Sequence, residues 1–579
     1  MESGVKPLFE EVNAELLMEY TKNIAQEVRL SGSEEELRAF YYVKGKLEEF
    51  GIEPVLEFCD AYISLPVSGD IEVEGVPFTC ITHSMGATTP EGGVEGPIVY
   101  VGKGLEVDFL NQNVQGKIVL IDGLATGPSV ERAEASGAIA AIFINAEYTH
   151  EMIVSSVWGS PTTKTFPLLP NLPVVSLTAK RGNEIKSILS ENVRANARVQ
   201  TKVDTGWRKI PFLTGEIKGN VEPEKFVLFS GHIDSWHYGA MDNGTANATM
   251  VEVARIIASH KSELRRSVRF AFWSGHSHGR YAASTWYCDQ NWEELHENGV
   301  AHVNIDSVGA KGASILSENN CMAETKEIVK RSVLKIANQH FNGSRYSRAG
   351  DQSFWGTGMP SLLMGLSEQP ASEEPAAQAF GQLFGGGKTG GYGWWWHTTE
   401  DMIDKIDLKN LRRDCQVYLD IVYDLATAPI IPVNHRLSVA EMKDALNQYA
   451  DQAKGAIDFG VALERVIELE NKLNKMYGLI ENGENLSEYE YLFNEGIIQL
   501  SQELVPLNYV KGNRFDQDLA VNPVVIPSLS DISKLEQVEP QTHEFFLLRT
   551  ELTRSINKVN YALLQANRIV DKVLDIENN

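Results

Sequence analysis

The sequence is short of long apolar runs, of paired cysteines and of positive charge, and each shortage excludes a class of protein. No apolar run approaches the roughly 20 residues that a membrane-spanning helix needs. The five cysteines are scattered, with no Cys-x-x-Cys pair, which argues against a disulfide framework and against a cysteine-based zinc site. Lysine and arginine number 52 against 78 aspartates and glutamates, and the net charge of -26 argues against nucleic acid or an anionic membrane surface as a partner.

The first residues, Met1 to Gly4, have neither the basic part nor the apolar part of a signal peptide. The scattered cysteines are typical of a protein kept in a reducing compartment. We therefore expect a cytoplasmic protein.

A chain of 579 residues is too long for one hydrophobic core, so several domains are expected. Strand-like and helix-like segments alternate from residue 226, which predicts an α/β fold with a mostly parallel sheet flanked by helices. Short β-rich runs separated by Gly, Pro and Asn predict an inserted β-rich domain before them. Helical periodicity after Pro432, over residues 444–477, 488–503 and 544–576, predicts a helical domain. The expected domains are 1–60 with 216–430, 61–215, and 431–579.

The region 366–396 is rich in glycine and interrupts the alternation of strands and helices. A long glycine-rich loop within a compact domain is more often functional than structural. We expect a functional loop, with a disordered surface loop as the alternative.

Potential metal ligands follow the predicted strands. His232 and Asp234 come after the apolar run Phe226–Phe229, and Asp242 lies eight residues further on. The carboxyl ends of parallel strands meet at one edge of a sheet, so these residues can share a cleft with Asp306 and His397. Two imidazoles with carboxylates suit zinc or another first-row divalent ion. Asp234 is expected to accept the free N–H of His232 and to fix its tautomer.

These residues occur in motifs that resemble those of the co-catalytic zinc aminopeptidase family, which includes glutamate carboxypeptidase and the transferrin receptor. The motifs are Gly231-His232-x-Asp234-Ser235-Trp236, Gly239-Ala240-x-Asp242-Asn243, Phe270-x-Phe272-Trp273-Ser274-Gly275, Asn304-x-Asp306, Gly350-Asp351-Gln352-Ser353-Phe354, Gly358-Met359-Pro360 and Trp396-His397-Thr398-x-x-Asp401. The inserted segment resembles the protease-associated domain of that family. The C-terminal helices resemble its dimerisation domain, so a homodimer is expected.

The resemblance implies that Asp242 bridges two metal ions, with His232 and Asp306 on one ion and His397 on the other. In that family two glutamates follow the strand that ends at Gly275, the first as general base and the second as metal ligand. Here those positions hold His276 and Ser277. Both glutamates are replaced.

The replacement leaves several roles open. His276 could be the base, because an imidazole transfers protons near neutral pH, or it could be a ligand in a histidine-rich site. His278 could likewise be a catalytic residue or replace the missing metal ligand. His237 could reach the same cleft. Asp351, Tyr392 and Trp396 are candidates for substrate binding.

The sequence therefore predicts a metal-dependent hydrolase of a C–N bond in a peptide or a small amide-like molecule, with an altered, histidine-rich site and a specialised substrate. One or two zinc ions are expected, with iron or another divalent transition metal as an alternative. Two other functions stay open: a non-catalytic binding or assembly protein on the same scaffold, and a non-hydrolytic metalloenzyme, either a lyase or a redox enzyme.

Overall fold

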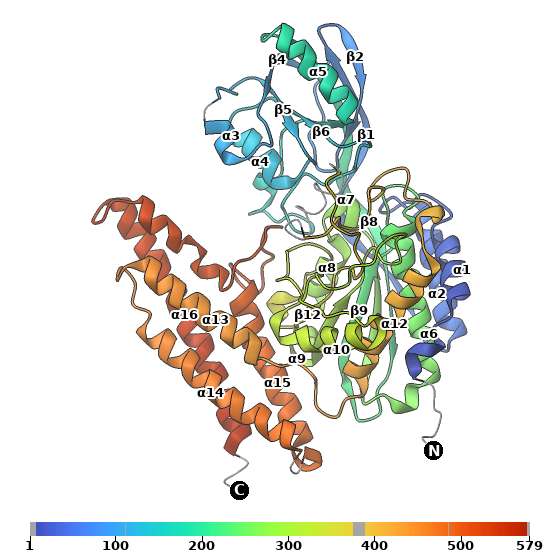
Figure 1. Ribbon diagram of the computed structural model, residues 1–579, viewed down its shortest axis with the longest axis vertical. Coiled ribbons are helices and arrows are strands. Elements are labelled where there is room, and N and C mark those ends of the chain that lie inside the picture. Colours follow the sequence, from blue (N-terminus) through green and yellow to red (C-terminus); the bar gives the residue numbers. More distant parts are fainter. Residues whose placement is uncertain (1–6, 111, 375–387, 484–485, 576–579) are drawn as a thin grey trace.

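The computed structural model describes residues 7–110, 112–374, 388–483 and 486–575. A mixed sheet forms the centre of the molecule (Figure 1). Its strands run in the order β12 (Ser361–Leu362), β11 (Gly299–Asn304), β9 (Glu222–His232), β10 (Arg266–Trp273) and β8 (Asn196–Ile217). The first four are parallel to one another and β8 is antiparallel to β10.

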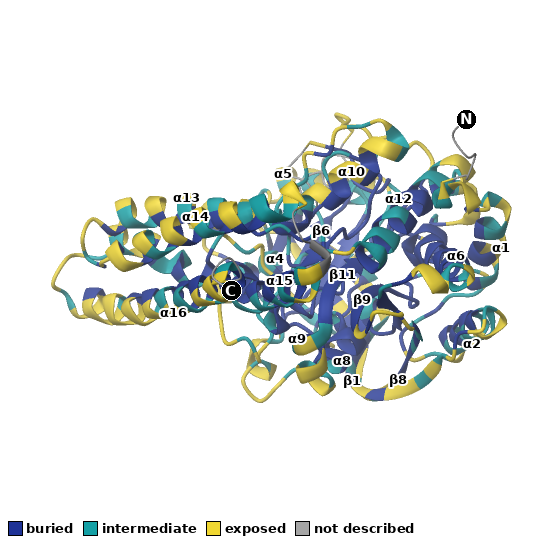
Figure 2. Ribbon diagram, turned by 90° about the horizontal axis from the view of Figure 1, so that it is seen from below, coloured by how far each residue is buried: buried dark blue, intermediate teal, exposed yellow. Residues whose placement is uncertain are grey.

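Helices cover both faces of this sheet (Figure 2). Residues 226–229 in the middle of β9 are buried, as expected for a strand covered on both faces. One face carries α1 (Ala14–Ile24), α2 (Glu34–Glu49), α6 (Ala246–Ser259) and α12 (Leu408–Thr427), with α10 (Lys326–Ala337) against α12. The other carries α8 (Ala282–Gln290) and α9 (Trp292–Asn298).

The inserted region is joined to the central sheet by two long antiparallel strands, β1 (Val55–Val73) and β8. Beyond them, β4 (Val94–Tyr100), β5 (Ile118–Asp122), β6 (Ala140–Ile144) and β7 (Val174–Leu177) form a parallel sheet. The smaller strands β2 (Val76–Thr79) and β3 (Ile81–Thr82) pair with β1 and β7, and the helices here are α3 (Glu106–Leu110), α4 (Gly127–Ala135) and α5 (Ala179–Glu191). The expected boundaries at 60 and 216 fall within β1 and β8, so no break in the chain marks them and they stay predictions.

The C-terminal region consists of helices that project beside the α/β body (Figures 1 and 2). They are α13 (Arg436–Ala453), α14 (Gly460–Asn482), α15 (Leu486–Tyr509) and α16 (His543–Leu574). The single helical segment predicted over 444–477 is wrong, because Lys454 and Gly455 take positive φ of 47° and 82° and end α13. Between α15 and α16 the chain forms a further helical stretch, η8 (Pro527–Gln537).

The predicted fold class is confirmed: a mostly parallel α/β sheet flanked by helices, an inserted β-rich region and a helical C-terminal region. Short helical turns connect the larger elements: η1 (Leu8–Glu11), η2 (Phe166–Leu168), η3 (Ala240–Thr245), η4 (Lys261–Glu263), α7 (His276–Gly279), η5 (Ala323–Thr325), η6 (Trp355–Thr357) and η7 (Ile403–Lys405). Among the described helices, none combines the length and the apolar character needed to cross a membrane.

Candidate metal and active site

The candidate site lies where three neighbouring parallel strands end. β9 ends at His232, which pairs in register with Trp273, the last residue of β10. β11 ends at Asn304, two residues before Asp306. The left-handed turn at Gly275, with φ of 73°, then places His276 at the start of α7. The sheet thus brings together residues that lie far apart in the sequence.

His232 presents a buried lone pair to two carboxylates. Its Nδ1 lies 2.9 Å from the carbonyl oxygen of Asp234, which can only accept, so Nδ1 carries the hydrogen. Its Nε2 is buried without a hydrogen-bond partner and lies 3.3 Å from Oδ1 of Asp242 and 3.6 Å from Oδ1 of Asp306. Two ligands of a tetrahedral zinc ion lie roughly 3.3–3.4 Å apart when each is about 2.0–2.1 Å from the metal. The donor set and its spacing fit a divalent ion.

The carboxylate of Asp234 is buried beneath His232. Its Oδ1 lies 3.5 Å from Nδ1 of His232, while Oδ2 accepts hydrogen bonds from Oγ of Ser31 (2.8 Å) and from the backbone N–H of Ser277 (2.8 Å). Burial alone would raise the pKa of Asp234, but the contact with His232 and the charges of nearby histidines hold this pKa well below its usual range. Asp234 therefore stays anionic and fixes both His232 and the turn that follows β10.

Asp242 lies between two imidazoles. Its Oδ1 faces His232, and its Oδ2 is 3.0 Å from Nε2 of His397. Burial would raise the pKa of Asp242, but its contacts with the imidazoles of His232 and His397 hold this pKa well below its usual range. Asp401 fixes the turn by accepting from the backbone N–H groups of Met241 and Asp242, both at 2.9 Å.

His397 is held by its neighbours on both ring nitrogens. Its Nδ1 lies 2.7 Å from the carbonyl oxygen of Glu151, in the inserted region, and therefore donates to it. Its Nε2 accepts from the indole N–H of Trp236 at 3.2 Å. The ring also stacks on Trp396, with centroids 3.3 Å apart. A ring fixed in this way has its Nε2 lone pair already directed at an N–H donor.

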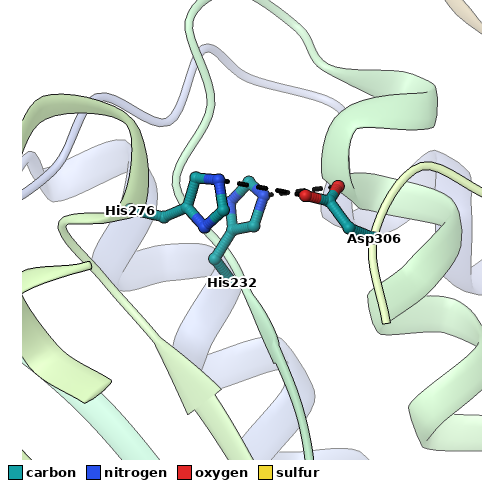
Figure 3. Close-up of side chains that lie close together, drawn as sticks. All are labelled: His232, His276 and Asp306. Carbon is teal, nitrogen blue, oxygen red and sulfur yellow. Dashed lines mark ion pairs between the residues drawn. The ribbon is translucent and has the colours of Figure 1, made fainter. Parts of the chain in front are cut away.

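His276 lies beside His232 and faces Asp306 (Figure 3). The two imidazoles stack with centroids 3.7 Å apart and an interplanar angle of 16°. Nε2 of His276 is 3.8 Å from Oδ2 of Asp306, and its Nδ1 is 2.9 Å from Oδ2 of Asp351. His232, His276 and Asp306 each offer a potential ligand atom, and these three atoms lie within 4.8 Å of one another.

The other two predicted histidines lie behind the site. Nδ1 of His278 is 2.9 Å from Oγ of Ser31, and its ring packs against Trp236 with centroids 4.4 Å apart. Burial lowers the pKa of His278 to about 4, so the imidazole is neutral at pH 7. Nε2 of His237 faces Oε1 of Glu151 at 3.8 Å. Neither histidine lines the cavity described next.

A cavity of about 360 Å³ opens over the site. His276, Ser277 and Asp306 form part of its wall, as do Tyr392 and Trp396. Asp351, expected to contact substrate, does not line it; this carboxylate lies behind His276 and accepts a second hydrogen bond, from Ser284. The predicted site residues are thus divided between the cavity wall and the layer that supports it.

All three regions of the chain contribute to the cavity wall. Residues 126–128 and 152–153 come from the inserted region, and 520–522 from the C-terminal region. Two arginines on the wall connect these regions to the α/β body. Arg280 donates to the carbonyl oxygens of Ile153 and Ser155, and Arg348 to the carbonyl oxygen of Asp518 and the side chain of Gln517.

Several supporting residues carry no motif that would predict their role. Arg29 is buried and donates to the carbonyl oxygens of Ile233, Tyr238 and Gly239, which shapes the loop after His232. Glu151 holds His397 through backbone hydrogen bonds in both directions. Arg29 lies between α1 and α2, away from every motif. The role of Glu151 depends on its backbone, so its residue type does not reveal it.

The predicted glycine-rich loop is described only at its two ends. Gln369 and residues 390–391 exchange backbone hydrogen bonds, and Tyr392 and Trp396 follow on the cavity wall. Gly381 and Gly385 to Gly387 lie outside the described residues. The described part of the loop therefore lies next to the site.

The fold and this cluster of potential ligands are similar to those of zinc peptidases, as the comparisons with known proteins indicate. Residues 213–422 match the model of peptidase family M28, and residues 94–185 match that of the PA domain. The α/β body is therefore similar to peptidase family M28 over these residues, and part of the inserted region is similar to the PA domain.

Three individual proteins show how far the similarity extends. A probable glutamate carboxypeptidase of Zea mays is 28% identical over 271 residues, covering 38% of each chain. Transferrin receptor protein 1 of Gallus gallus is 22% identical over 297 residues, covering 42% of this chain and 38% of the receptor. The structure of a zinc aminopeptidase from Bacillus subtilis superposes with a TM-score of 0.56 at 20% identity, covering 73% of this chain and 97% of that one.

These similarities have limited extent. The match to the first curated relatives spans between 38% and 50% of their length. At 20% identity, the structural similarity to the aminopeptidase shows the fold alone.

Proposed function

We propose that the protein is a metal-dependent hydrolase of a C–N bond in a peptide or a small amide-like molecule. The observation that carries this proposal is the buried lone pair of His232, which faces the carboxylates of Asp242 and Asp306 at the wall of a cavity. The match of residues 213–422 to the model of peptidase family M28 supports the reaction class.

His232, Asp242 and Asp306 would hold a zinc ion or another divalent ion, with His397 in contact with Asp242. Such an ion acts as a Lewis acid toward a carbonyl oxygen. The surrounding residues fix the ligands: Asp234 orients His232, and Asp401 holds the backbone of Asp242. A site built in this way keeps its anionic ligands in place before a substrate arrives.

His276 is the proposed proton acceptor. Asp351 accepts the hydrogen on its Nδ1, which leaves the Nε2 lone pair directed toward Asp306 and the cavity. An imidazole oriented by a carboxylate is suited to proton transfer at neutral pH. The roles of His278 as a base or a ligand stay predictions; its contacts with Ser31 and Trp236 favour a positioning role.

The substrate is proposed to be small, because the cavity is enclosed by three regions of the chain. Tyr392 and Trp396 line it and are proposed to contact the substrate, whereas His237 and Asp351 lie outside its wall. A specialised substrate is proposed because the usual glutamate pair is replaced by His276 and Ser277. The cytoplasmic location, the homodimer, and the absence of nucleic acid or membrane partners stay predictions.

The test combines metal analysis with an activity screen. The purified protein is expected to contain stoichiometric metal and to hydrolyse members of a panel of aminoacyl amides, dipeptides and small amides. His232→Ala and Asp242→Ala are each expected to lose both metal and activity. His543→Ala, at an exposed histidine that begins α16, is the matched control and should retain both. A protein that holds no metal, and whose activity survives both substitutions, would overturn the proposal.

A second candidate function is a non-catalytic binding or assembly protein. It is favoured by one observation, the presence of His276 and Ser277 where the family resemblance implies glutamates. A metal-free protein with no activity on the panel would support this function. A metal-containing protein without hydrolytic activity would instead support a lyase or redox enzyme, and identification of the bound element, zinc or iron, would separate these from hydrolysis.

A further inference from the structure

The two sides of Asp242 are not equivalent as places for a metal ion. On the first side, Oδ1 of Asp242 shares its surroundings with the unpartnered Nε2 of His232 and with Asp306. On the second side, Oδ2 faces only His397 among the ion pairs of the described residues. One side therefore has three potential ligands, and the other has two.

The second side also contains an N–H donor where a ligand would be needed. The indole of Trp236 donates to Nε2 of His397, the same atom that faces Asp242. An indole N–H is a donor only and cannot coordinate a cation. Ser277, on the cavity wall, offers a neutral hydroxyl, and its backbone N–H is bound to Asp234. The second side therefore has Asp242 as its carboxylate but no further anionic ligand from Ser277, and the lone pair of His397 already accepts from Trp236.

The stacking of His276 on His232 determines what His276 can do on the first side. The lone pair of an imidazole nitrogen lies in the plane of its ring, so an ion on His232 lies in that plane, about 2.0–2.1 Å from Nε2. The ring of His276 is nearly parallel to it, with centroids 3.7 Å apart. With the rings nearly parallel, the lone pair of His276 would run beside that of His232, so His276 is assigned as a base although its ligand atom lies within 4.8 Å of the others. His232, Asp242 and Asp306 would then hold the ion, and three protein ligands are usual in catalytic zinc sites.

We propose that this chain binds one divalent ion, held by His232, Asp242 and Asp306, and that Trp236 and Ser277 keep the position beside His397 free of a second ion. The inference rests on the proposed function in that it requires a metal site. The two fail differently: a protein that binds no ion contradicts the proposed function, and one that binds two ions contradicts this inference alone.

The first experiment uses the wild-type protein. Metal is removed with a chelator, and Zn²⁺ or Co²⁺ is titrated back. After gel filtration, elemental mass spectrometry measures the number of bound ions per chain. One ion per chain is expected. In the Co²⁺ form, the electron paramagnetic resonance signal should integrate to one isolated ion per chain. Two ions per chain, or a signal reduced by coupling between neighbouring ions, would overturn the proposal.

The second experiment restores what the second side lacks. Ser277→Glu adds a carboxylate beside His397, and Trp236→Phe removes the N–H donor while keeping an aromatic ring. The double variant is expected to bind two ions per chain, and Ser277→Gln, of similar size but uncharged, only one. His397→Ala is expected to keep one ion. A double variant that is folded by circular dichroism and still binds one ion, or a loss of the ion in His397→Ala, contradicts the roles assigned to these residues.

Discussion

On one side of Asp242, the imidazole of His232 presents a buried lone pair that no hydrogen-bond donor reaches, and Asp306 faces the same atom. On the other side, the equivalent atom of His397 accepts from Trp236, and Ser277 offers no charge. We call these the Asp306 half, comprising His232 and Asp306, and the His397 half, comprising His397, Trp236 and Ser277. Asp242 is common to both.

The two halves also differ in how the fold builds them. The Asp306 half depends on two neighbouring parallel strands, β9 and β11, whose register sets the positions of the side chains. The His397 half depends on Trp236 in the loop after β9 and on Glu151 in the inserted region. The two halves thus depend on different parts of the chain.

The largest expected effect is on metal affinity, when one potential ligand in each half is replaced by an amide side chain. Asp306→Asn removes an anionic ligand and is expected to weaken metal binding by at least about 100-fold, the upper end of the cost of losing a supporting residue. His397→Gln is expected to weaken it by only about 10-fold, the lower end. Competition with a fluorescent chelator measures both. Equal losses in the two variants would show that the halves are equivalent.

The Asp306 half can be predicted from the sequence because its residues follow strand ends, and strand ends share an edge of the sheet. The apolar runs before His232 and Asp306 are enough to place both residues at that edge. The contact of Trp236 with His397 joins residues 161 positions apart, and no periodicity encodes it. The role of Glu151 is equally hidden, because its contribution is made by the backbone.

The fold, like the site, can be predicted from the sequence only in part. The alternation of strands and helices identifies the α/β sheet, since burial on both faces gives β9 its apolar run at residues 226–229. The break between α13 and α14 escapes the helical periodicity, although Gly455 marks it, because apolar spacing continues on both sides. The motif around Asp351 predicts a substrate contact, whereas its carboxylate lies behind His276.

A smaller effect is expected from Asp351, which supports His276 without touching the cavity. Asp351→Asn removes the carboxylate that holds the hydrogen on Nδ1 of His276, and kcat is expected to fall about 100-fold, at the low end of the effects of general acid–base catalysis. KM and the metal content are expected to stay the same. Steady-state kinetics on a substrate identified in the screen, together with metal analysis, measure this difference.

Ser284→Ala is the matched control for this substitution. It removes the other hydrogen bond to Asp351, from a neutral hydroxyl, and should change kcat less than about tenfold, because a neutral hydrogen bond contributes about 1 kcal/mol. Asp351→Glu should recover part of the activity. Loss of metal in Asp351→Asn would place His276 among the ligands and add it to the Asp306 half.

The smallest expected effect is that of His435→Gln. This substitution tests whether metal is released at low pH because the C-terminal region unfolds. His435 is buried in the C-terminal region, with Nε2 on Ser501, and burial lowers its pKa to about 4. The unfolded chain, with an ordinary histidine pKa near 6.5, binds the proton more readily, so the free energy of unfolding falls as pH decreases from about 6.5 to 4. Between pH 7 and pH 5 this group contributes a loss of about 2 kcal/mol.

His435→Gln is expected to remove that loss, so that hydrogen exchange in the C-terminal helices changes less between pH 7 and pH 5 than in the wild type. Metal release from the Asp306 half over the same range should be unchanged, because His435 has no contact with it. A variant that retains metal to lower pH would show that acid release follows unfolding of the C-terminal region. Residues 520–522 of that region line the cavity. Such a result would therefore mean that both halves require a folded C-terminal region.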